Sequence, residues 1–292
     1  MKFSGSYTAL VTPFRDGAVD AKALQDFVAW QVAEGSDGVV PCGTTGESPT
    51  LSHDEHKRVV ELTVEAASGR AVVMAGTGSN STAEAIDFIR HAEQAGADAA
   101  LVVCPYYNRP TQEGLYQHYK AIHDASGLPI VIYNIPGRTG VDMSIETMRR
   151  LALLPRIAGV KDATGDLARP LRTRLAIGPD FDQLSGEDIT VLPFLAQGGV
   201  GCISVVSNVA PKLCATLHRA WASGDVAAAV RINERLAPLA DALFCETNPI
   251  PVKYAVSLLG RCEPTVRGPL LPASETARAR VEQAMRQAGL AN

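Results

Sequence analysis

Eight short apolar runs recur along the first two-thirds of the chain, and each is nearly continuous instead of alternating in polarity. Strands that are buried on both faces have this pattern. The segments between the runs carry helix-start signals: Ser52-His53-Asp54-Glu55 and Ser81-Thr82-Ala83-Glu84 both have the form of a capping box. The predicted strands cover residues 6–14, 38–43, 71–78, 99–105, 129–136, 157–164, 181–188 and 201–208.

Alternating strands and helices in this number predict an α/β fold, specifically a (β/α)8 TIM barrel. A doubly wound parallel sheet is the alternative, but no G-x-G-x-x-G motif follows the first strand. From about residue 210 the pattern becomes helical, in the segments 210–223, 224–244 and 275–289. The sequence therefore predicts a catalytic barrel over residues 1–224 and a C-terminal helical region over residues 225–292.

Composition narrows the functional classes. The chain has 292 residues, is 46% hydrophobic and has a formal net charge of -4, which argues against a nucleic-acid partner. No apolar run is long enough to span a membrane, and the start lacks a secretory signal pattern, so a cytoplasmic location is expected. Six scattered cysteines indicate neither a disulfide framework nor a zinc site. No nearby cysteine or cluster of carboxylates completes a site with His53 and His56, so no metal is expected.

The chemistry of a barrel enzyme gathers where the strands end. The sixth predicted strand, IAGVKDAT, carries Lys161 near its end, and the fifth carries Tyr133 at an equivalent depth. A surface lysine and a core tyrosine are the ordinary interpretations of these residues taken alone. Together at the mouth of a barrel they favour Schiff-base chemistry, in which a desolvated neutral amine attacks a ketone and a phenol relays protons.

Two loops offer groups that bind anions. The stretch Gly43-Thr44-Thr45-Gly46-Glu47 supplies hydroxyls and backbone amides that suit a carboxylate, although a plain strand–helix turn fits it equally well. Glu47 is expected to be structural. Arg138 follows the fifth strand and can bind a second carboxylate through two hydrogen bonds, although a solvated loop arginine is the ordinary interpretation. Gly186, at the end of the seventh strand, completes the expected substrate-binding set.

Four motifs, in this order and spacing, resemble one known family. They are GTTGE (43–47), PYYNRP (105–110), YNIPGRTG (133–140) and GVKDATG (159–165). The chain resembles the dihydrodipicolinate synthase family, within the superfamily of pyruvate-dependent Schiff-base aldolases. The resemblance extends over the whole chain. It implies condensation of pyruvate with L-aspartate 4-semialdehyde in the diaminopimelate route to L-lysine, with no metal or organic cofactor.

The resemblance also implies a role for individual residues. Lys161 would form the imine with pyruvate, and Tyr133 would move protons in a relay with Thr44 and Tyr107. Thr45 and the backbone around Ile203 would hold pyruvate, and Arg138 the carboxylate of the semialdehyde. The tyrosine at position 107 would enter a neighbouring subunit, so the resemblance implies a homotetramer built as a dimer of dimers. A site for the inhibitor L-lysine is implied by matches at Ser48, His53, His56, Asn80, Glu84 and Tyr106.

Other functions stay open at this point. A sugar-acid lyase or dehydratase of the same superfamily would share the turn, the tyrosine and the lysine, but Arg138 and the Tyr106-Tyr107 pair disfavour it. A metal-dependent barrel would need more acidic residues at neighbouring strand ends than Asp162, Glu187 and Asp188. A barrel that only binds a ligand also remains an alternative, because fold does not dictate function.

Overall fold

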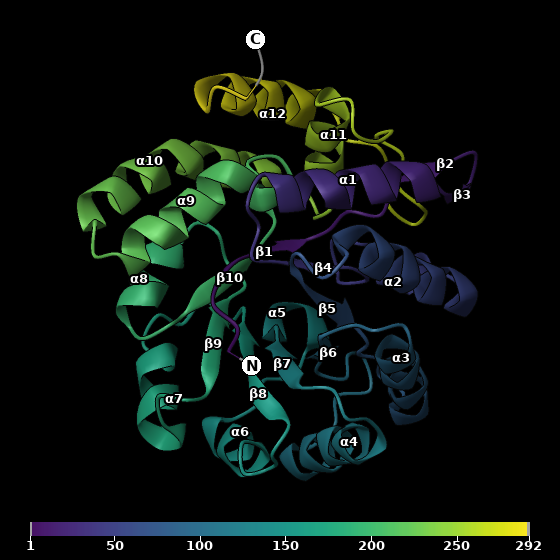
Figure 1. The fold of residues 1–292 in the computed structure, drawn as a ribbon, viewed down its shortest axis with the longest axis vertical. Coiled ribbons are helices and arrows are strands. Elements are labelled where there is room, and N and C mark those ends of the chain that lie inside the picture. Colours follow the sequence, from purple (N-terminus) through teal and green to yellow (C-terminus); the bar gives the residue numbers. More distant parts are fainter. Residues whose placement is uncertain (1, 291–292) are drawn as a thin grey trace. The chain divides into compact units, whose positions relative to one another are not determined.

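The computed structural model describes residues 2–290, and its central strands form a closed parallel barrel (Figure 1). The strand order is β1-β10-β9-β8-β7-β6-β5-β4. The predicted (β/α)8 barrel is confirmed, and the doubly wound sheet is excluded. The strands are β1 (Gly5–Ala9), β4 (Gly38–Val40), β5 (Val72–Gly76), β6 (Ala99–Val103), β7 (Ile130–Asn134), β8 (Ile157–Asp162), β9 (Asp182–Ser185) and β10 (Gly201–Ser204).

The described chain divides into two compact units. The first contains residues 2–4 and 74–203. Its strands are almost fully buried: every residue of β7 lies inside, as its continuous apolar run predicts, and every residue of β9 lies inside although its sequence, DQLS, is largely polar. In this unit α3 packs against α4, α4 against α6 and α6 against α7. Its helices are α3 (Thr82–Gln94), α4 (Gln112–Ala125), α5 (Pro136–Thr139), α6 (Ile145–Leu151), α7 (Arg169–Ile177) and α8 (Val191–Ala196).

The second unit contains residues 5–73 and 204–290. Here α1 packs against α2, while α9, α11 and α12 each pack against α10. Its elements are β2 (Phe14–Arg15), β3 (Ala18–Val19), α1 (Ala21–Ala33), η1 (Ser48–Thr50), α2 (His53–Ala67), η2 (Val206–Asn208), α9 (Pro211–Ala222), α10 (Val226–Leu243), α11 (Ile250–Leu258) and α12 (Glu275–Gln287). The predicted division at residue 224 stays a prediction, and residues 291 and 292 lie outside the described part.

The β2–β3 hairpin and helix α11 of the second unit were not predicted from the sequence. The β2–β3 hairpin turns through Asp16 and Gly17, which both have positive φ, and the Asp-Gly pair is the usual signal for such a turn. Helix α11 has the sequence IPVKYAVSL, which is apolar nearly all round and so lacks the 3.6-residue alternation of a surface helix. Within residues 2–290, no helix is both long and apolar enough to cross a membrane.

The two predicted capping boxes differ in the structure. At α2 the box is complete, because Ser52 Oγ accepts from Glu55 N and Glu55 Oε2 accepts from Ser52 N at 2.9 Å. At α3, Ser81 Oγ accepts from Glu84 N, but the Glu84 carboxylate accepts from Ser79 Oγ instead of reaching back to the cap. The second half of that predicted box is therefore wrong, because the Ser79 hydroxyl competes for the carboxylate.

Candidate active site

Lys161 and Tyr133 lie side by side on neighbouring strands. They are register partners in the parallel pair β7–β8, and Lys161 Nζ lies 4.2 Å from the centroid of the Tyr133 ring. Each residue is only 6% exposed. A buried ammonium over an aromatic face is held by the ring's quadrupole, while the neutral amine at the same place is a nucleophile shielded from water. The pair can therefore combine amine chemistry with proton transfer.

The loop after β9 passes directly over Lys161. Gly186 N donates to Asp162 O at 2.7 Å, and a Cβ on Gly186 would stand 3.2 Å from Lys161 Cε and 2.7 Å from Ala163 Cβ. Glycine is therefore the only residue that fits at position 186 without displacing the Lys161 side chain or the loop. Glu187 follows on this loop, and burial raises the pKa of its carboxyl, with Asp188 adding to the rise and Lys161 opposing it. Sequence reasoning noted Glu187 at a strand end but gave it no role at the site.

Three further predicted residues belong to the same unit. Arg138 lies exposed on the short helix α5, directly after β7. Ile203 is fully buried on β10. Tyr107 follows β6 with a positive φ of 68° and is 89% exposed, which is unusual for an aromatic side chain. Its exposure distinguishes it from Tyr133, and the structure does not bury it within the protomer.

Thr44 and Thr45 follow β4 and belong to the other unit. Thr45 is buried, and its Oγ1 accepts from Asn248 Nδ2 at 3.0 Å. Glu47 ends the same loop with a left-handed backbone, and its carboxylate receives Lys253 Nζ at 2.6 Å and the backbone N–H of Arg267 at 2.8 Å. The loop is thus fixed by the C-terminal region, through Asn248 and Lys253, two residues that no sequence motif singled out.

Comparison with known proteins assigns this arrangement to a family. The model of the dihydrodipicolinate synthetase family matches residues 2–288. The chain belongs to this family. It is 65% identical over 288 residues to the 4-hydroxy-tetrahydrodipicolinate synthase of Rhodospirillum centenum, with 99% of both chains covered. The prediction of a lyase of the dihydrodipicolinate synthase type is confirmed, because both the family and this relative are named for that activity. The alternative of a sugar-acid lyase or dehydratase is not supported.

Solved members of the dihydrodipicolinate synthetase family share the fold throughout. The Aquifex aeolicus enzyme superposes with a TM-score of 0.97 at 45% identity, covering 99% of each chain. The chloride-inhibited enzyme of Acinetobacter baumannii, complexed with pyruvate, gives 0.96 at 45% identity over 98% of this chain and 99% of that one. The enzyme of Cyanidioschyzon merolae with lysine bound gives 0.95 at 40% identity over 99% and 100%.

The residues that the sequence analysis expects to bind L-lysine fall into two groups. Asn80, Glu84 and Tyr106 belong to the first unit, where Asn108 Nδ2 donates to Asn80 O at 2.9 Å and Asn108 N to Tyr106 O at 2.8 Å. The first contact joins the loop after β6 to the loop after β5, and the second closes a turn within the loop after β6. The other group belongs to the second unit, around the start of α2; it comprises Ser48 and His56, which are partly or fully buried, and the exposed His53.

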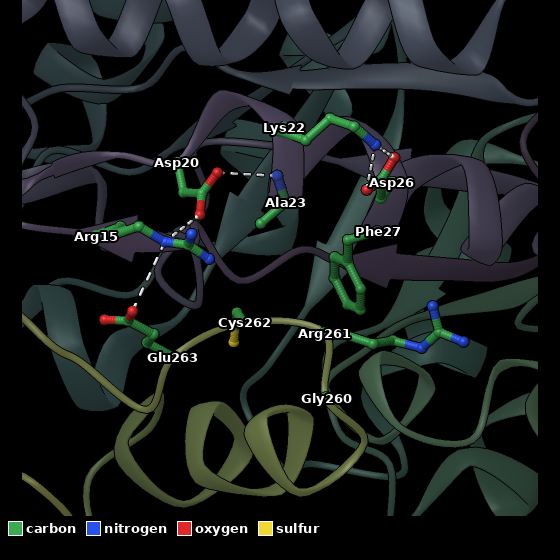
Figure 2. Close-up of a pocket in the computed structure, with 10 residues that line it drawn as sticks. All are labelled: Arg15, Asp20, Lys22, Ala23, Asp26, Phe27, Gly260, Arg261, Cys262 and Glu263. Atoms are coloured by element: carbon green, nitrogen blue, oxygen red, sulfur yellow. Dashed lines mark hydrogen bonds and ion pairs between the residues drawn. The ribbon is translucent and has the colours of Figure 1, made fainter.

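A cavity of about 420 Å³ lies in the second unit, between α1 and the loop after α11 (Figure 2). Its charges are matched within the protein: Arg15 Nε lies 2.9 Å from Asp20 Oδ2 and 3.6 Å from Glu263 Oε1, and Lys22 pairs with Asp26. The Arg261 guanidinium stacks on Trp30 at 3.7 Å. None of the predicted site residues lines it, and its paired charges favour a structural role.

Within residues 2–290 no three histidine, cysteine or acidic side chains gather into a group that could hold a metal ion. The six cysteines are free, and burial raises the pKa of Cys42 and of Cys104, the latter to about 12. Such thiols stay protonated and pack as small apolar groups.

Proposed function

We propose that this chain condenses pyruvate with L-aspartate 4-semialdehyde, with Lys161 as the amine that carries pyruvate. The observation that carries the proposal is the buried pair on adjacent strands, Lys161 Nζ at 4.2 Å from the Tyr133 ring, in a chain of this family. Pyruvate bound to a relative of the same fold supports the substrate class.

The first half of the reaction activates pyruvate. The neutral amine of Lys161 adds to the pyruvate ketone, and the resulting hydroxyl leaves as water after it accepts a proton, which forms an imine. Loss of a proton from the pyruvate methyl group then gives an enamine. Tyr133 is the group assigned to carry these protons, in a relay with Thr44 and Tyr107. Thr45 and the backbone at Ile203 hold the pyruvate carboxylate.

The second half forms the carbon–carbon bond and releases the enzyme. The enamine carbon attacks the aldehyde, and the alkoxide accepts a proton through the Tyr133 relay. The substrate's own amine then adds to the imine carbon and displaces the Lys161 amine, which closes the ring. Arg138, exposed on α5, is assigned to the carboxylate of the semialdehyde, for which its planar fork is suited.

Borohydride trapping tests the proposal. The protein is incubated with pyruvate and borohydride, its peptides are mapped by mass, and semialdehyde consumption is measured in parallel. Lys253 provides an internal control, because it is also buried but is paired with Glu47. A pyruvate-sized adduct on Lys161 and not on Lys253, with turnover of the semialdehyde, is the expected result. An adduct without turnover would redirect the search to sugar-acid substrates, and no adduct would refute the Schiff base.

We also propose that Tyr107 acts in the site of a second copy, within a dimer that pairs into a tetramer. The 89% exposure of this aromatic side chain in the single chain supports the proposal. Inactive Lys161→Ala and weakened Tyr107→Phe proteins are mixed under conditions of subunit exchange. If Tyr107 crosses between copies, mixing restores activity, because one site then has both groups. No gain on mixing, or a monomeric mass in sedimentation, would contradict the proposal.

L-lysine is the proposed inhibitor at Ser48, His53, His56, Asn80, Glu84 and Tyr106, and a solved relative with lysine bound supports this. Glu84 is the natural partner of an ammonium group. Turnover in millimolar L-lysine is expected to fall in the wild type and to fall less in Glu84→Gln, which keeps an acceptor for Ser79 Oγ. An unchanged wild-type rate would end the hypothesis.

A further inference from the structure

The residues that directly follow the proposed catalytic pair are also paired across the strands. Asn134 comes after Tyr133 on β7, Asp162 comes after Lys161 on β8, and the two are register partners. Because side chains alternate along a strand, Asn134 and Asp162 lie on the face opposite to the catalytic pair. Both are buried, at 0% and 5% exposure. Buried polar groups at this position need partners.

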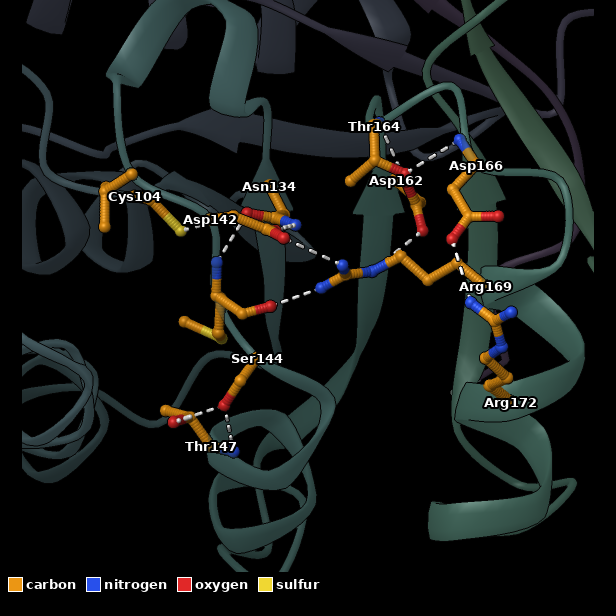
Figure 3. A network of polar contacts seen from close by, with 12 residues as sticks. Cys104, Asn134, Asp142, Ser144, Thr147, Asp162, Thr164, Asp166, Arg169 and Arg172 are labelled. Atoms are coloured by element: carbon orange, nitrogen blue, oxygen red, sulfur yellow. Dashed lines mark hydrogen bonds and ion pairs between the residues drawn. The ribbon is translucent and has the colours of Figure 1, made fainter.

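One arginine and one aspartate, Arg169 and Asp142, are the charged partners of this pair (Figure 3). Asn134 Nδ2 donates to Asp142 Oδ1 at 2.7 Å, and Asn134 Oδ1 accepts from Met143 N at 3.1 Å. Arg169, at the start of α7, donates from its terminal nitrogens to Asp142 Oδ2 at 3.1 Å and to Met143 O. Arg169 Nε faces Asp162 Oδ2 at 3.5 Å. The guanidinium thus reaches both strand ends, one directly and one through Asp142.

The same group also fixes the loop that carries Arg138. Asp142 and Met143 follow that loop, and Arg169 binds both. Gln112 on α4 donates to Asp142 O at 2.8 Å, and Arg109 Nε donates to Gly140 O at 2.9 Å. A displacement of Asp142 would therefore move the Arg138 loop together with the end of β7.

The electrostatics make Arg169 hard to replace. Burial raises the pKa of the Asp162 carboxyl above its ordinary value, and two hydrogen bonds from Thr164 and the charge of Arg169 offset part of this rise. The Arg169 side chain is only 10% exposed, and a buried charge needs a partner of opposite sign. Asp142 and Asp162 provide it. Removing the guanidinium leaves the buried Asp162 carboxylate with hydrogen bonds from Thr164 but without a charged partner, which is unfavourable.

We infer that Asp142 and Arg169, here called the Asp142–Arg169 clamp, are positioning residues for the reaction, acting through three groups that touch substrate: Lys161, Tyr133 and Arg138. The inference rests on the proposed function of those three. The clamp itself lies on the other face of the strands. The clamp holds the ends of β7 and β8 in register, and so determines how the Lys161 amine approaches the Tyr133 phenol. It also holds the loop that carries Arg138 in place.

The test compares Arg169→Met with Arg172→Met. Arg172 lies one turn further along α7 and is ion-paired with Asp166 at 3.2 Å, but its side chain is 63% exposed. Borohydride trapping at Lys161, kcat, and the KM for the semialdehyde are measured well below each Tm. For Arg169→Met, trapping and kcat are expected to fall about tenfold to hundredfold, because small misplacements of reacting groups have such effects. The semialdehyde KM should rise, while Arg172→Met stays near wild type.

Two conservative variants separate positioning from folding. Arg169→Lys keeps the charge and is expected to recover part of the trapping rate; Asp142→Asn keeps an acceptor for Asn134 and should show a smaller loss of the same kind. A lower Tm with wild-type trapping, kcat and KM in Arg169→Met would overturn the inference, and if that variant does not fold, unchanged kinetics in Asp142→Asn would do so. Absence of trapping in the wild type would instead overturn the proposed function, and this inference with it.

Discussion

The hydroxyl of Tyr133 can be removed while the ring that covers Lys161 stays in place. In Tyr133→Phe the contact between Lys161 Nζ and the ring face is kept, so folding should be unaffected. The proton relay is lost, and kcat is expected to fall about 100- to 10,000-fold. Steady-state kinetics and the rate of borohydride trapping check this. A variant with wild-type kcat would show that another group moves the protons, and Glu187 would be the next candidate.

The Lys161 side chain also needs the space that Gly186 leaves beside it. Gly186→Ala puts a methyl group 3.2 Å from Lys161 Cε and 2.7 Å from Ala163 Cβ, so the lysine or the loop after β9 must shift. We expect kcat to fall about tenfold or more. Gly137→Ala is the matched control, since a Cβ there meets nothing within 4 Å. Equal kinetics in both variants would mean that the loop yields without moving Lys161.

At the scale of elements, most strands were predictable because burial on both faces leaves a continuous apolar run, and β9, with the sequence DQLS, is the exception. Their register then brings Lys161 and Tyr133 together, and the sequence allowed both to be proposed as catalytic because the active sites of barrels lie at strand ends. Helix α11 was not predicted because its sequence is apolar nearly all round and lacks the periodicity of a surface helix. The partners Asn248 of Thr45 and Lys253 of Glu47 lie 203 and 206 residues away in sequence. No local pattern encodes a pairing over that distance.

The ion pair between α11 and the loop after β4 gives a prediction at this scale. Lys253 is fully buried, its Nζ lies 2.6 Å from Glu47 Oε1 and 3.9 Å from the centroid of the Phe14 ring, and burial lowers its pKa against the opposing effect of Glu47. Lys253→Met leaves the Glu47 carboxylate buried without its cation. The free energy of unfolding should fall by about 3–5 kcal/mol.

The double variant Lys253→Met with Glu47→Gln removes the uncompensated charge as well. Urea unfolding at neutral pH is expected to show that it regains part of the stability lost in Lys253→Met alone, because a neutral amide is less costly to bury than a lone carboxylate. If the single variant is as stable as the wild type, the pair does not anchor the loop that carries Thr44 and Thr45.

At the scale of the whole molecule, two buried histidines predict how stability depends on pH. His118 on α4 and His218 on α9 are 5% and 7% exposed, and burial lowers the pKa of each to about 4. His118 Nδ1 shares a hydrogen bond with Thr82 Oγ1 at 2.9 Å. Each folded-state pKa lies below the unfolded value of 6.5. The unfolded chain therefore binds protons first as the pH falls.

Stability from these histidines is complete above about pH 6.5 and is lost as the pH falls toward 4. When the pH is lowered from 7 to 5, each of the two histidines should lower the free energy of unfolding by about 2 kcal/mol, because it binds a proton in the unfolded chain only. Urea denaturation at both pH values measures the loss in the wild type and in His118→Gln and His218→Gln. Each variant should lose less between the two pH values, since glutamine does not titrate. An unchanged pH dependence in both variants would contradict the prediction, because it would mean that the two histidines take up protons in the folded protein as readily as in the unfolded chain.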